Sequence, residues 1–509
     1  MAISQRATRY LGLTTLRTWR KSYHDEKFHY HNTTQLEGHQ VAYTYDNHCG
    51  ERILDKTVLG YGSLFGLQEG TGLTGNRYSL VGSIGPIAQL AWQPFSMFLI
   101  VKVPPRILMS TLVLGMGISQ GAIAASYNYV GLLASCFFLG LFQAGCLPLF
   151  SIITSQWYRR VEQPLRVAAW YSTNGAATIV ASTISFGLGH ILSERLQSWQ
   201  MYEIALSSPG PWPSSNTAIL NRRFKRKKPR RSNAYAQTKR EQALATKNLN
   251  GRTSSKLSEP KTYLWIAMSL LLSVGSAVTN VFGPLILNGL GYDKYHSSLL
   301  NIPFGTIQLI AILVTSHIAQ KCRVKSAILV LLILPVIAGL TMLHVLDRNP
   351  SQKSTLLVAY YMLAILFGGV PLIVAWIVGN TAGATKQSVI TSLYNAGSSA
   401  GNIIGLLLFN KADAPSYHLG LRNVLGIFVV LVGVVLLQAG NLVLLNQVQK
   451  MRRIADGKEA AIVDRSMEER YIHTDESNGH GGAGGRENPQ DHALLDLTDR
   501  ENNEFVYIY

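Results

Sequence analysis

The chain has 509 residues, of which 47% are hydrophobic and 15% are charged, and its formal net charge at pH 7 is +18. The charged fraction is well below the ~25% of soluble domains, and long apolar stretches recur between short polar connectors. These features exclude a string of water-soluble domains and favour a polypeptide that crosses a membrane many times. In such a protein the basic excess belongs to cytoplasmic loops, so we expect no nucleic-acid partner.

The cysteines and histidines show no spacing that suits a metal. The four cysteines are Cys49, Cys136, Cys146 and Cys322, and they suggest neither a zinc site nor a disulfide framework. We find no phosphate-binding glycine loop, no nucleophile elbow and no paired carboxylates in an aqueous domain. We therefore expect no cofactor, no metal, no enzymatic activity and no ATP-driven pumping.

Residues 1–53 are predicted to form a polar tail, and the apolar piece from Thr57 to Leu67 is only long enough for half of a membrane-spanning helix. Ten longer apolar windows each predict a spanning helix. These windows are 80–101, 106–126, 130–154, 167–192, 263–288, 299–318, 325–346, 355–379, 387–409 and 421–445.

The predicted spans fall into two groups. Residues 54–192 form an incomplete N-terminal transmembrane half, and residues 263–446 form a C-terminal half. Residues 193–262 contain a run of lysine and arginine that is typical of a cytoplasmic central loop. Residues 447–509 are rich in acidic residues, amides and glycine, which predicts a disordered tail.

The positions of lysine and arginine show that one crossing is missing. Basic residues in short loops resist translocation, so these loops are assigned to the cytoplasm. The residues concerned are Lys102, Arg106, Arg159, Arg160, Arg166, Lys321, Arg323, Lys325, Lys386, Lys450, Arg452 and Arg453. Each half alternates consistently, but the span ending at Leu192 should emerge outside whereas the span starting at Tyr263 should begin inside. No window between Trp199 and Asn221 is apolar enough to supply the crossing.

A transporter needs polar groups at mid-membrane depth, because a solute must regain there the hydrogen bonds that it loses on leaving water. The candidate substrate and coupling residues are Gln93, Asn174, Asn280, Asn402, Asp55 and Lys56, with Asn395 as a further polar position. Asp55 and Lys56 are adjacent charges at the mouth of the short apolar piece. An alternative role for each amide is a helix–helix hydrogen bond, worth only ~0.6–2 kcal/mol.

Two rows of glycines at a spacing of four residues predict close helix packing. Gly397, Gly401 and Gly405 form one row, and Gly117 and Gly121 form the other. Such rows suit static packing and also suit helices that slide during transport.

Four stretches carry a family resemblance. They are Thr154 to Arg166 with the sequence TSQWYRRVEQPLR, Leu54 to Tyr61, Trp376 to Gly383 with Lys386, and Gly401 to Gly405 followed by Asp413 to Pro415. These stretches resemble fungal major facilitator superfamily permeases of the allantoate permease type, the anion:cation symporter branch.

The resemblance implies an all-α fold of two six-helix halves with a substrate site between them. It also implies proton-coupled uptake of a small organic anion such as allantoate, nicotinate, pantothenate or a related vitamin or nitrogen compound. Family members have complete first and sixth helices, whereas here the first is truncated and the sixth is missing. The loop residues Arg159, Arg160, Glu162 and Arg166 are assigned the role of a cytoplasmic latch between helices.

We therefore predict a monomeric, multi-pass transporter of the plasma membrane that works by alternating access. Two alternatives stay open. One is a transport-inactive, degenerate or mis-spliced family member, and the other is a polytopic membrane enzyme or scaffold.

Overall fold

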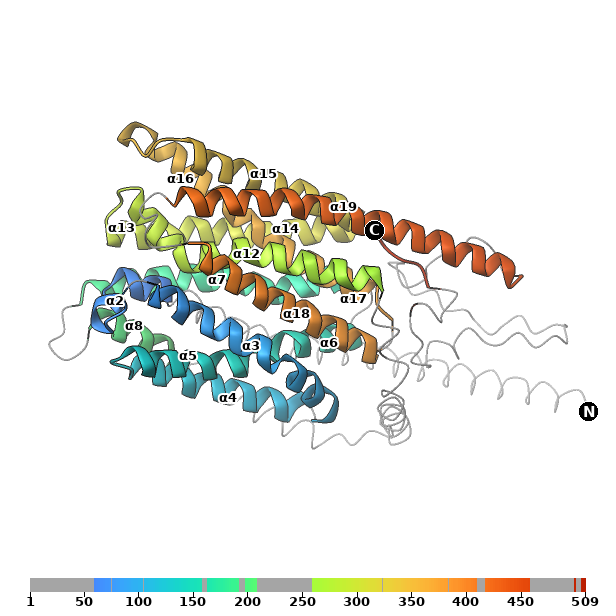
Figure 1. Ribbon diagram of the computed structural model, residues 1–509, viewed down its shortest axis with the longest axis horizontal. Coiled ribbons are helices and arrows are strands. Elements are labelled where there is room, and N and C mark those ends of the chain that lie inside the picture. Colours follow the sequence, from blue (N-terminus) through green and yellow to red (C-terminus); the bar gives the residue numbers. More distant parts are fainter. Residues whose placement is uncertain are drawn as a thin grey trace, which may run out of the picture. The chain divides into compact units, whose positions relative to one another are not determined.

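The computed structural model describes residues 59–74, 76–103, 105–157, 163–191, 197–207, 259–322, 324–382, 384–409, 417–457, 499 and 505–509. The secondary structure within these ranges is helical and contains no strand (Figure 1). Each of the ten predicted spans coincides with one described helix or with a run of consecutive helices. The all-α, polytopic fold class is therefore confirmed.

The N-terminal half begins with a helical stretch at residues 59–64. Its further helices are α2 (Leu67–Gly70), α3 (Arg77–Lys102), α4 (Pro105–Ala124), α5 (Tyr129–Gln143), α6 (Cys146–Trp157), α7 (Gln163–Gly189) and α8 (Ser198–Ser207). Helix α5 starts at a side-chain cap, because the Asn128 Oδ1 atom accepts the N–H of Gly131 at 2.7 Å. Helices α5 and α6 together form the span that was predicted at 130–154.

The C-terminal half contains α12 (Pro260–Gly289), α13 (Lys294–Leu299), α14 (Asn301–Cys322), α15 (Lys325–Val345), η1 (Pro350–Gln352), α16 (Lys353–Met362), η2 (Leu363–Gly368), α17 (Gly369–Gly379), α18 (Ala384–Leu407) and α19 (His418–Ala455). The span predicted at 355–379 is interrupted by the 3₁₀ turn η2. Pro371 explains the interruption, because it has no N–H to donate to the carbonyl of Phe367 and its ring crowds that carbonyl.

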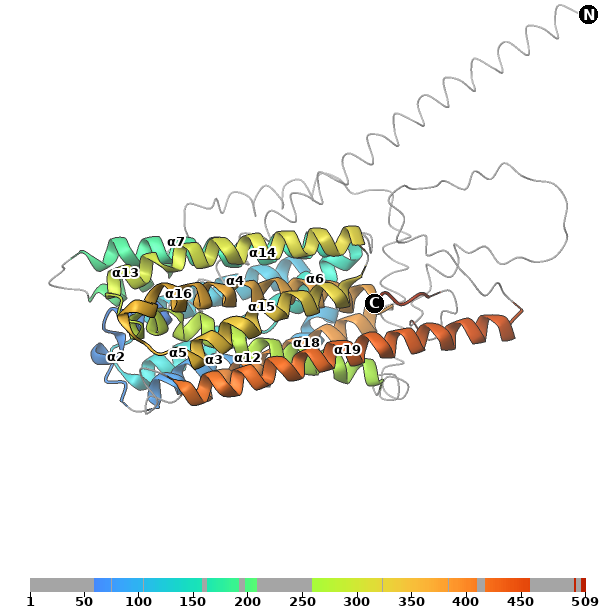
Figure 2. The ribbon, with the colours of Figure 1, turned by 90° about the horizontal axis from the view of Figure 1, so that it is seen from above.

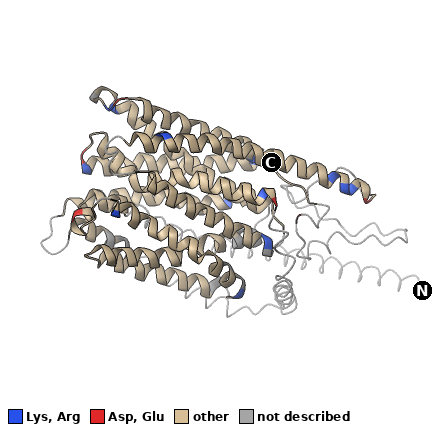
Figure 3. Ribbon diagram, viewed as in Figure 1, with Lys and Arg blue, Asp and Glu red and all other residues tan. Residues whose placement is uncertain are grey.

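The two halves meet mainly along two pairs of helices, α3 with α18 and α7 with α14 (Figures 1 and 2). Seven of the described segments are long and apolar enough to cross a membrane by length and composition, and α3, α7 and α18 are not among them. These three helices tolerate polar residues because much of their surface faces protein. Charged residues gather at the helix ends (Figure 3), and exposed side chains such as Leu114, Leu331 and Leu437 suit contact with lipid.

The glycine row of α18 lies directly against α12. A Cβ atom added to Gly397 would lie 2.8 Å from the carbonyl oxygen of Ile266, and one added to Gly405 would lie 2.6 Å from that of Val274. A Cβ atom at Gly401 would overlap the carbonyl oxygen of Leu270. The backbones of these two helices therefore approach as closely as only glycine allows.

The end of α7 and the start of α12 lie at opposite ends of the bundle. The Tyr295 hydroxyl of α13 donates to the carbonyl of Gly189 at 3.2 Å, so the end of α7 lies beside the segment that follows α12. Helix α12 has 30 residues and is roughly 45 Å long at 1.5 Å per residue. Its first residue therefore lies at the opposite end of the bundle from Gly189.

Helix α8 lies within the segment 193–262 that is predicted to be the central loop. It packs against α4 and α7, and Trp199 and Tyr202 are buried. The ring of Tyr202 meets that of Tyr61, whose hydroxyl lies 2.6 Å from the Ser182 hydroxyl. With 10 residues, α8 is roughly 15 Å long, about half of a ~30 Å hydrocarbon core, so it cannot supply the crossing. Residues 208–258 lie outside the described part.

The structure also differs from the disordered tail expected at 447–509. Helix α19 continues to Ala455, and Asp499 with Phe505–Tyr509, here called the strap, packs against helix ends of the C-terminal half. The composition of the whole segment concealed this contact, because the strap is short and its last five residues are aromatic or branched.

We expect Gly401→Ala to lower the thermal unfolding temperature of the detergent-solubilised protein, because the added methyl group forces α12 and α18 apart. Overpacking of this kind costs ~1–3 kcal/mol. The matched control is Gly117→Ala, where no atom of a neighbouring element in the described part lies within 4 Å of the added Cβ, and where alanine favours the helix by ~1 kcal/mol. Equal unfolding temperatures for the two variants would contradict the packing argument.

Candidate functional site

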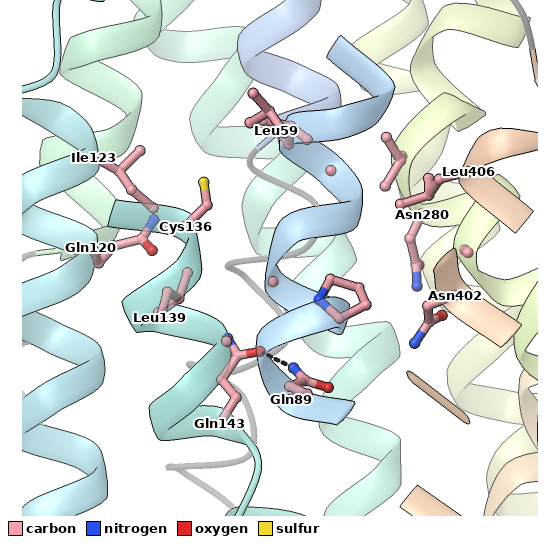
Figure 4. Close-up of a pocket in the computed structure, with 17 residues that line it drawn as sticks. Leu59, Gln89, Gln120, Ile123, Cys136, Leu139, Gln143, Asn280, Asn402 and Leu406 are labelled. Carbon is pink, nitrogen blue, oxygen red and sulfur yellow. Dashed lines mark hydrogen bonds between the residues drawn. The ribbon is translucent and has the colours of Figure 1, made fainter. Parts of the chain in front are cut away.

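A cavity of about 90 Å³ lies between the two halves. Its walls come from α3, α4 and α5 of the N-terminal half, from α12 and α18 of the C-terminal half, and from Leu59 (Figure 4).

Five amide side chains supply most of the polarity of this cavity: Gln89, Gln120, Gln143, Asn280 and Asn402. Each amide can both donate and accept hydrogen bonds. Figure 4 shows Gln120 and Gln143 on one side of α3, and Asn280 and Asn402 on the other. No charged side chain lines the cavity among the residues that the structure describes. The site can therefore bind a polar solute through hydrogen bonds without supplying a fixed charge.

Gln89 connects three helices at this site. Its Nε2 atom donates to Oε1 of Gln143 at 2.8 Å (Figure 4), and its Oε1 atom accepts the hydroxyl of Ser399 at 3.3 Å. One turn further along α3, Oε1 of Gln93 accepts Nδ2 of Asn395 at 2.9 Å. Because both helices use residues four positions apart, these contacts form a ladder of amide and hydroxyl bonds between the halves.

The hydrogen bonds of this ladder are weak enough for α3 and α18 to separate during transport. Hydrogen bonds between transmembrane helices average only ~0.6 kcal/mol, so two or three of them cost less than the free energy of binding a micromolar solute, about 8 kcal/mol. The glycine contact of α12 with α18 lies within one half, and its close backbone packing does not let these two helices separate as easily. We therefore expect motion between α3 and α18 rather than between α12 and α18.

The structure places only some of the predicted site residues at the cavity. Asn280 and Asn402 line it, and Gln93 lies one turn from the lining residue Gln89. Asn174 is half-buried on α7 and is not part of the lining. Asp55 and Lys56 lie outside the described residues, so their assignment stays a prediction.

Sequence reasoning missed three lining residues, Gln89, Gln120 and Gln143. The signal was present, since each is an isolated amide in an apolar span, where polar residues are costly and often functional. Gln89 also precedes Gln93 by four residues and therefore shares its helix face.

The predicted cytoplasmic latch is only partly described. Arg166 lies in the first turn of α7 and is half-buried, whereas Arg159, Arg160 and Glu162 lie outside the described residues. The latch therefore stays a prediction.

Residues 53–406 match the Major Facilitator Superfamily. The chain belongs to this superfamily. Its likeness to known transporters, together with its apolar helices, makes it a membrane transporter of small molecules and not an enzyme.

Relatives of similar length come from fungi. An uncharacterized transporter of Schizosaccharomyces pombe is 28% identical over 483 residues, which cover 90% of this chain and 83% of the relative. The thiamine pathway transporter of Saccharomyces cerevisiae is 25% identical over 382 residues, covering 72% of this chain and 71% of that protein. An MFS-type transporter of Hormonema carpetanum is 23% identical, with coverage of 72% and 75% respectively.

A solved structure shares the fold. It is a bacterial homologue of the human lysosomal transporter Spinster in an inward-facing, unoccupied conformation. The TM-score is 0.53 at 13% sequence identity, and the match covers 78% of this chain and 96% of the other.

Cys136 lines the cavity and offers a native probe of solute binding. We expect a transported solute, at roughly ten times its Kd, to slow maleimide labelling of Cys136 by about tenfold, because the occupied fraction is protected. The exposed Cys322 at the end of α14 is the control and should label at an unchanged rate. Peptide mass spectrometry of labelled membranes measures both cysteines at once. Equal slowing at both positions would refute the assignment of this cavity as the solute site.

Proposed function

We propose that the chain is a proton-coupled secondary transporter that moves a small organic anion by alternating access. The observation that supports this function is the amide-lined cavity, whose walls come from both halves. A solute bound there contacts both halves at once, so its binding free energy can favour one relative arrangement of the halves over another.

The amide lining supports a carboxylate-bearing solute. Each Asn or Gln side chain provides two N–H donors, and a carboxylate accepts up to about four hydrogen bonds. Hydrogen bonds to an ionised acceptor are roughly twice as strong as those between neutral groups. The negative charge itself requires a cation, and we assign that role to Lys56, which precedes the lining residue Leu59 by three positions in the sequence.

Proton coupling requires a titratable group, and amides do not titrate in the physiological range. We assign proton carriage to Asp55, which precedes Leu59 by four positions. The resemblance to the allantoate permease branch supports both assignments. The similarity to a thiamine pathway transporter adds vitamin-related compounds to the solutes that deserve testing.

Membrane orientation follows from charge. Lys102, Lys325 and Lys386 lie at helix termini on the end of the bundle that also carries the strap. Basic residues near span ends favour the cytoplasm, so we assign this end to the cytoplasm and the protein to the plasma membrane, as a monomer.

A second candidate is a family member without transport activity. The observation that favours it is the length of α8 together with the opposite positions of the end of α7 and the start of α12. Among the described residues, no helix between α7 and α12 is long enough to cross a membrane. An irregular crossing would be costly, because its backbone groups would stay unpaired in the membrane.

We expect yeast that lacks its own permeases but expresses this chain to accumulate radiolabelled allantoate, nicotinate or pantothenate, tested in parallel. Asn402→Ala should raise the KM for the accepted solute by roughly tenfold or more, because a hydrogen bond to a charged group contributes ~1.5–3 kcal/mol. Asn174→Ala, outside the cavity lining, should leave the KM within about twofold. Surface abundance of both variants is measured by biotinylation. No uptake of any probe by an abundant protein would favour the inactive candidate instead.

We expect uptake by the wild-type protein to fall as external pH rises from about 5 to about 7.5, because the proton is a co-substrate and its concentration falls. Asp55→Asn should remove this pH dependence and net accumulation, since the carboxyl that carries the proton is lost. Exchange of labelled for unlabelled solute should persist in this variant, because exchange needs no net proton movement. Retention of the wild-type pH profile by Asp55→Asn would exclude Asp55 as the proton carrier.

A further inference from the structure

Two asparagines of the C-terminal half hold the backbone of the strap. Asn446 of α19 accepts the N–H of Tyr507 and donates to its carbonyl, each at 2.8 Å. Asn380, which directly follows α17, accepts the N–H of Ile508 at 2.7 Å and donates to its carbonyl at 2.8 Å. Each side chain thus satisfies both backbone groups of one residue, as a neighbouring β-strand would.

Further contacts also involve the backbone of the strap. The indole N–H of Trp376 donates to the carbonyl of Ile508 at 2.7 Å, and the backbone N–H of Lys325 donates to that of Tyr509 at 3.2 Å. These bonds recognise an extended peptide without regard to its side chains.

The charge of the strap is recognised separately. The carboxylate of Asp499 is buried and pairs with Lys261 of α12 and with Lys386 of α18, the latter at 2.9 Å. Burial raises the pKa of Asp499, but the two ammonium groups outweigh it and hold the pKa below its ordinary value. Glu259 also belongs to this cluster and lies 2.8 Å from Lys386 and 3.2 Å from Lys261. Among the described residues, Glu259 is the one carboxylate that the two lysines would share without Asp499, so the place that Asp499 occupies favours an acidic group.

Tyr507 connects the two kinds of recognition. Its hydroxyl donates to Asp499 at 2.7 Å, and its ring lies 4.9 Å from the Lys261 ammonium. The backbone of the same residue is held by Asn446. Tyr507 is therefore bound through its hydroxyl, its ring and its backbone at the same time.

We propose that the ends of α12, α15, α17, α18 and α19 form a groove that binds an extended acidic peptide, and that the strap of this chain is its resident ligand. The strap contacts all five of these helices, so its docking fixes their ends relative to one another. Because a tethered ligand acts at a millimolar effective concentration, the groove of the intact chain is occupied and excludes other peptides. This assignment does not depend on the transported solute.

Hydrogen exchange on the purified full-length protein tests docking of the strap. We expect the amides of Tyr507 and Ile508 to exchange at least tenfold more slowly than in a free peptide of residues 496–509. Asp499→Lys should abolish this protection by placing a third cation beside Lys261 and Lys386, and Tyr507→Phe should weaken it. The matched control is Asp347→Asn, an exposed acid outside the groove, which should leave protection unchanged. Size-exclusion profiles verify that each variant stays folded.

Peptide binding tests the groove itself. A fluorescent peptide of residues 496–509 should bind full-length Asp499→Lys protein at least tenfold more tightly than it binds the wild type, whose groove is occupied. Adding Asn380→Ala and Asn446→Ala to the Asp499→Lys protein should remove this binding. Equal affinity of the peptide for all three proteins would show that these helix ends form no peptide-binding groove. If the amides of the wild-type strap exchanged freely and the wild-type protein bound the peptide tightly, the strap would not be the resident ligand of the groove.

Discussion

Water is scarce in the core of a bilayer, and this scarcity decides which helices of the chain can face lipid. A polar side chain in hydrocarbon loses its hydrogen bonds to water and must find partners within the protein. Helices α3, α7 and α18 carry many of the amides and hydroxyls, and they pack along α18, α14 and α3 of the other half respectively. Apolar helices such as α4, α15 and α19 present leucine and valine outward. The division between interface and lipid surface therefore follows from solvation.

The same constraint places the cavity. Amides that cannot face lipid converge where α3, α4 and α5 meet α12 and α18, and there they bond to one another or border the cavity. Their bonds are weak and few, whereas the contact of the glycine row of α18 with α12 is continuous and close. One interface can thus open at low cost while the other keeps the C-terminal half intact. This contrast is the physical basis for rocking of the two halves.

The end of the bundle that we assign to the cytoplasm follows a different rule, because charges there can pair within the protein and near water. Lys261 and Lys386 come from helices on either side of the glycine contact, and the strap supplies Asp499 between them. The ion pairs join the ends of α12 and α18, which the glycine row holds together deeper in the half, and the two asparagines attach the strap to α17 and α19. The opposite end of the bundle holds α8 and the end of α7.

The membrane-spanning helices were predictable from sequence, because twenty apolar residues cannot be dissolved in water and need no tertiary partner to be recognised. Short local patterns also revealed membership of the Major Facilitator Superfamily, the conflict in the number of crossings, and the close packing row at Gly397, Gly401 and Gly405. Asn280 and Asn402 were found because an isolated amide in an apolar span is conspicuous. By the same rule Gln89, Gln120 and Gln143 could have been found.

Only the tertiary structure decided which amides share one cavity, since helices that are distant in sequence meet there and a pattern along one helix does not specify its neighbour. It also separated Asn174 from the cavity, and it gave α8 and the strap their places. Their sequences are short and mixed in polarity, so local propensity is too weak to reveal them. Their positions depend on partners that other parts of the chain provide, which are Tyr61 for α8 and Asn380, Asn446, Lys261 and Lys386 for the strap.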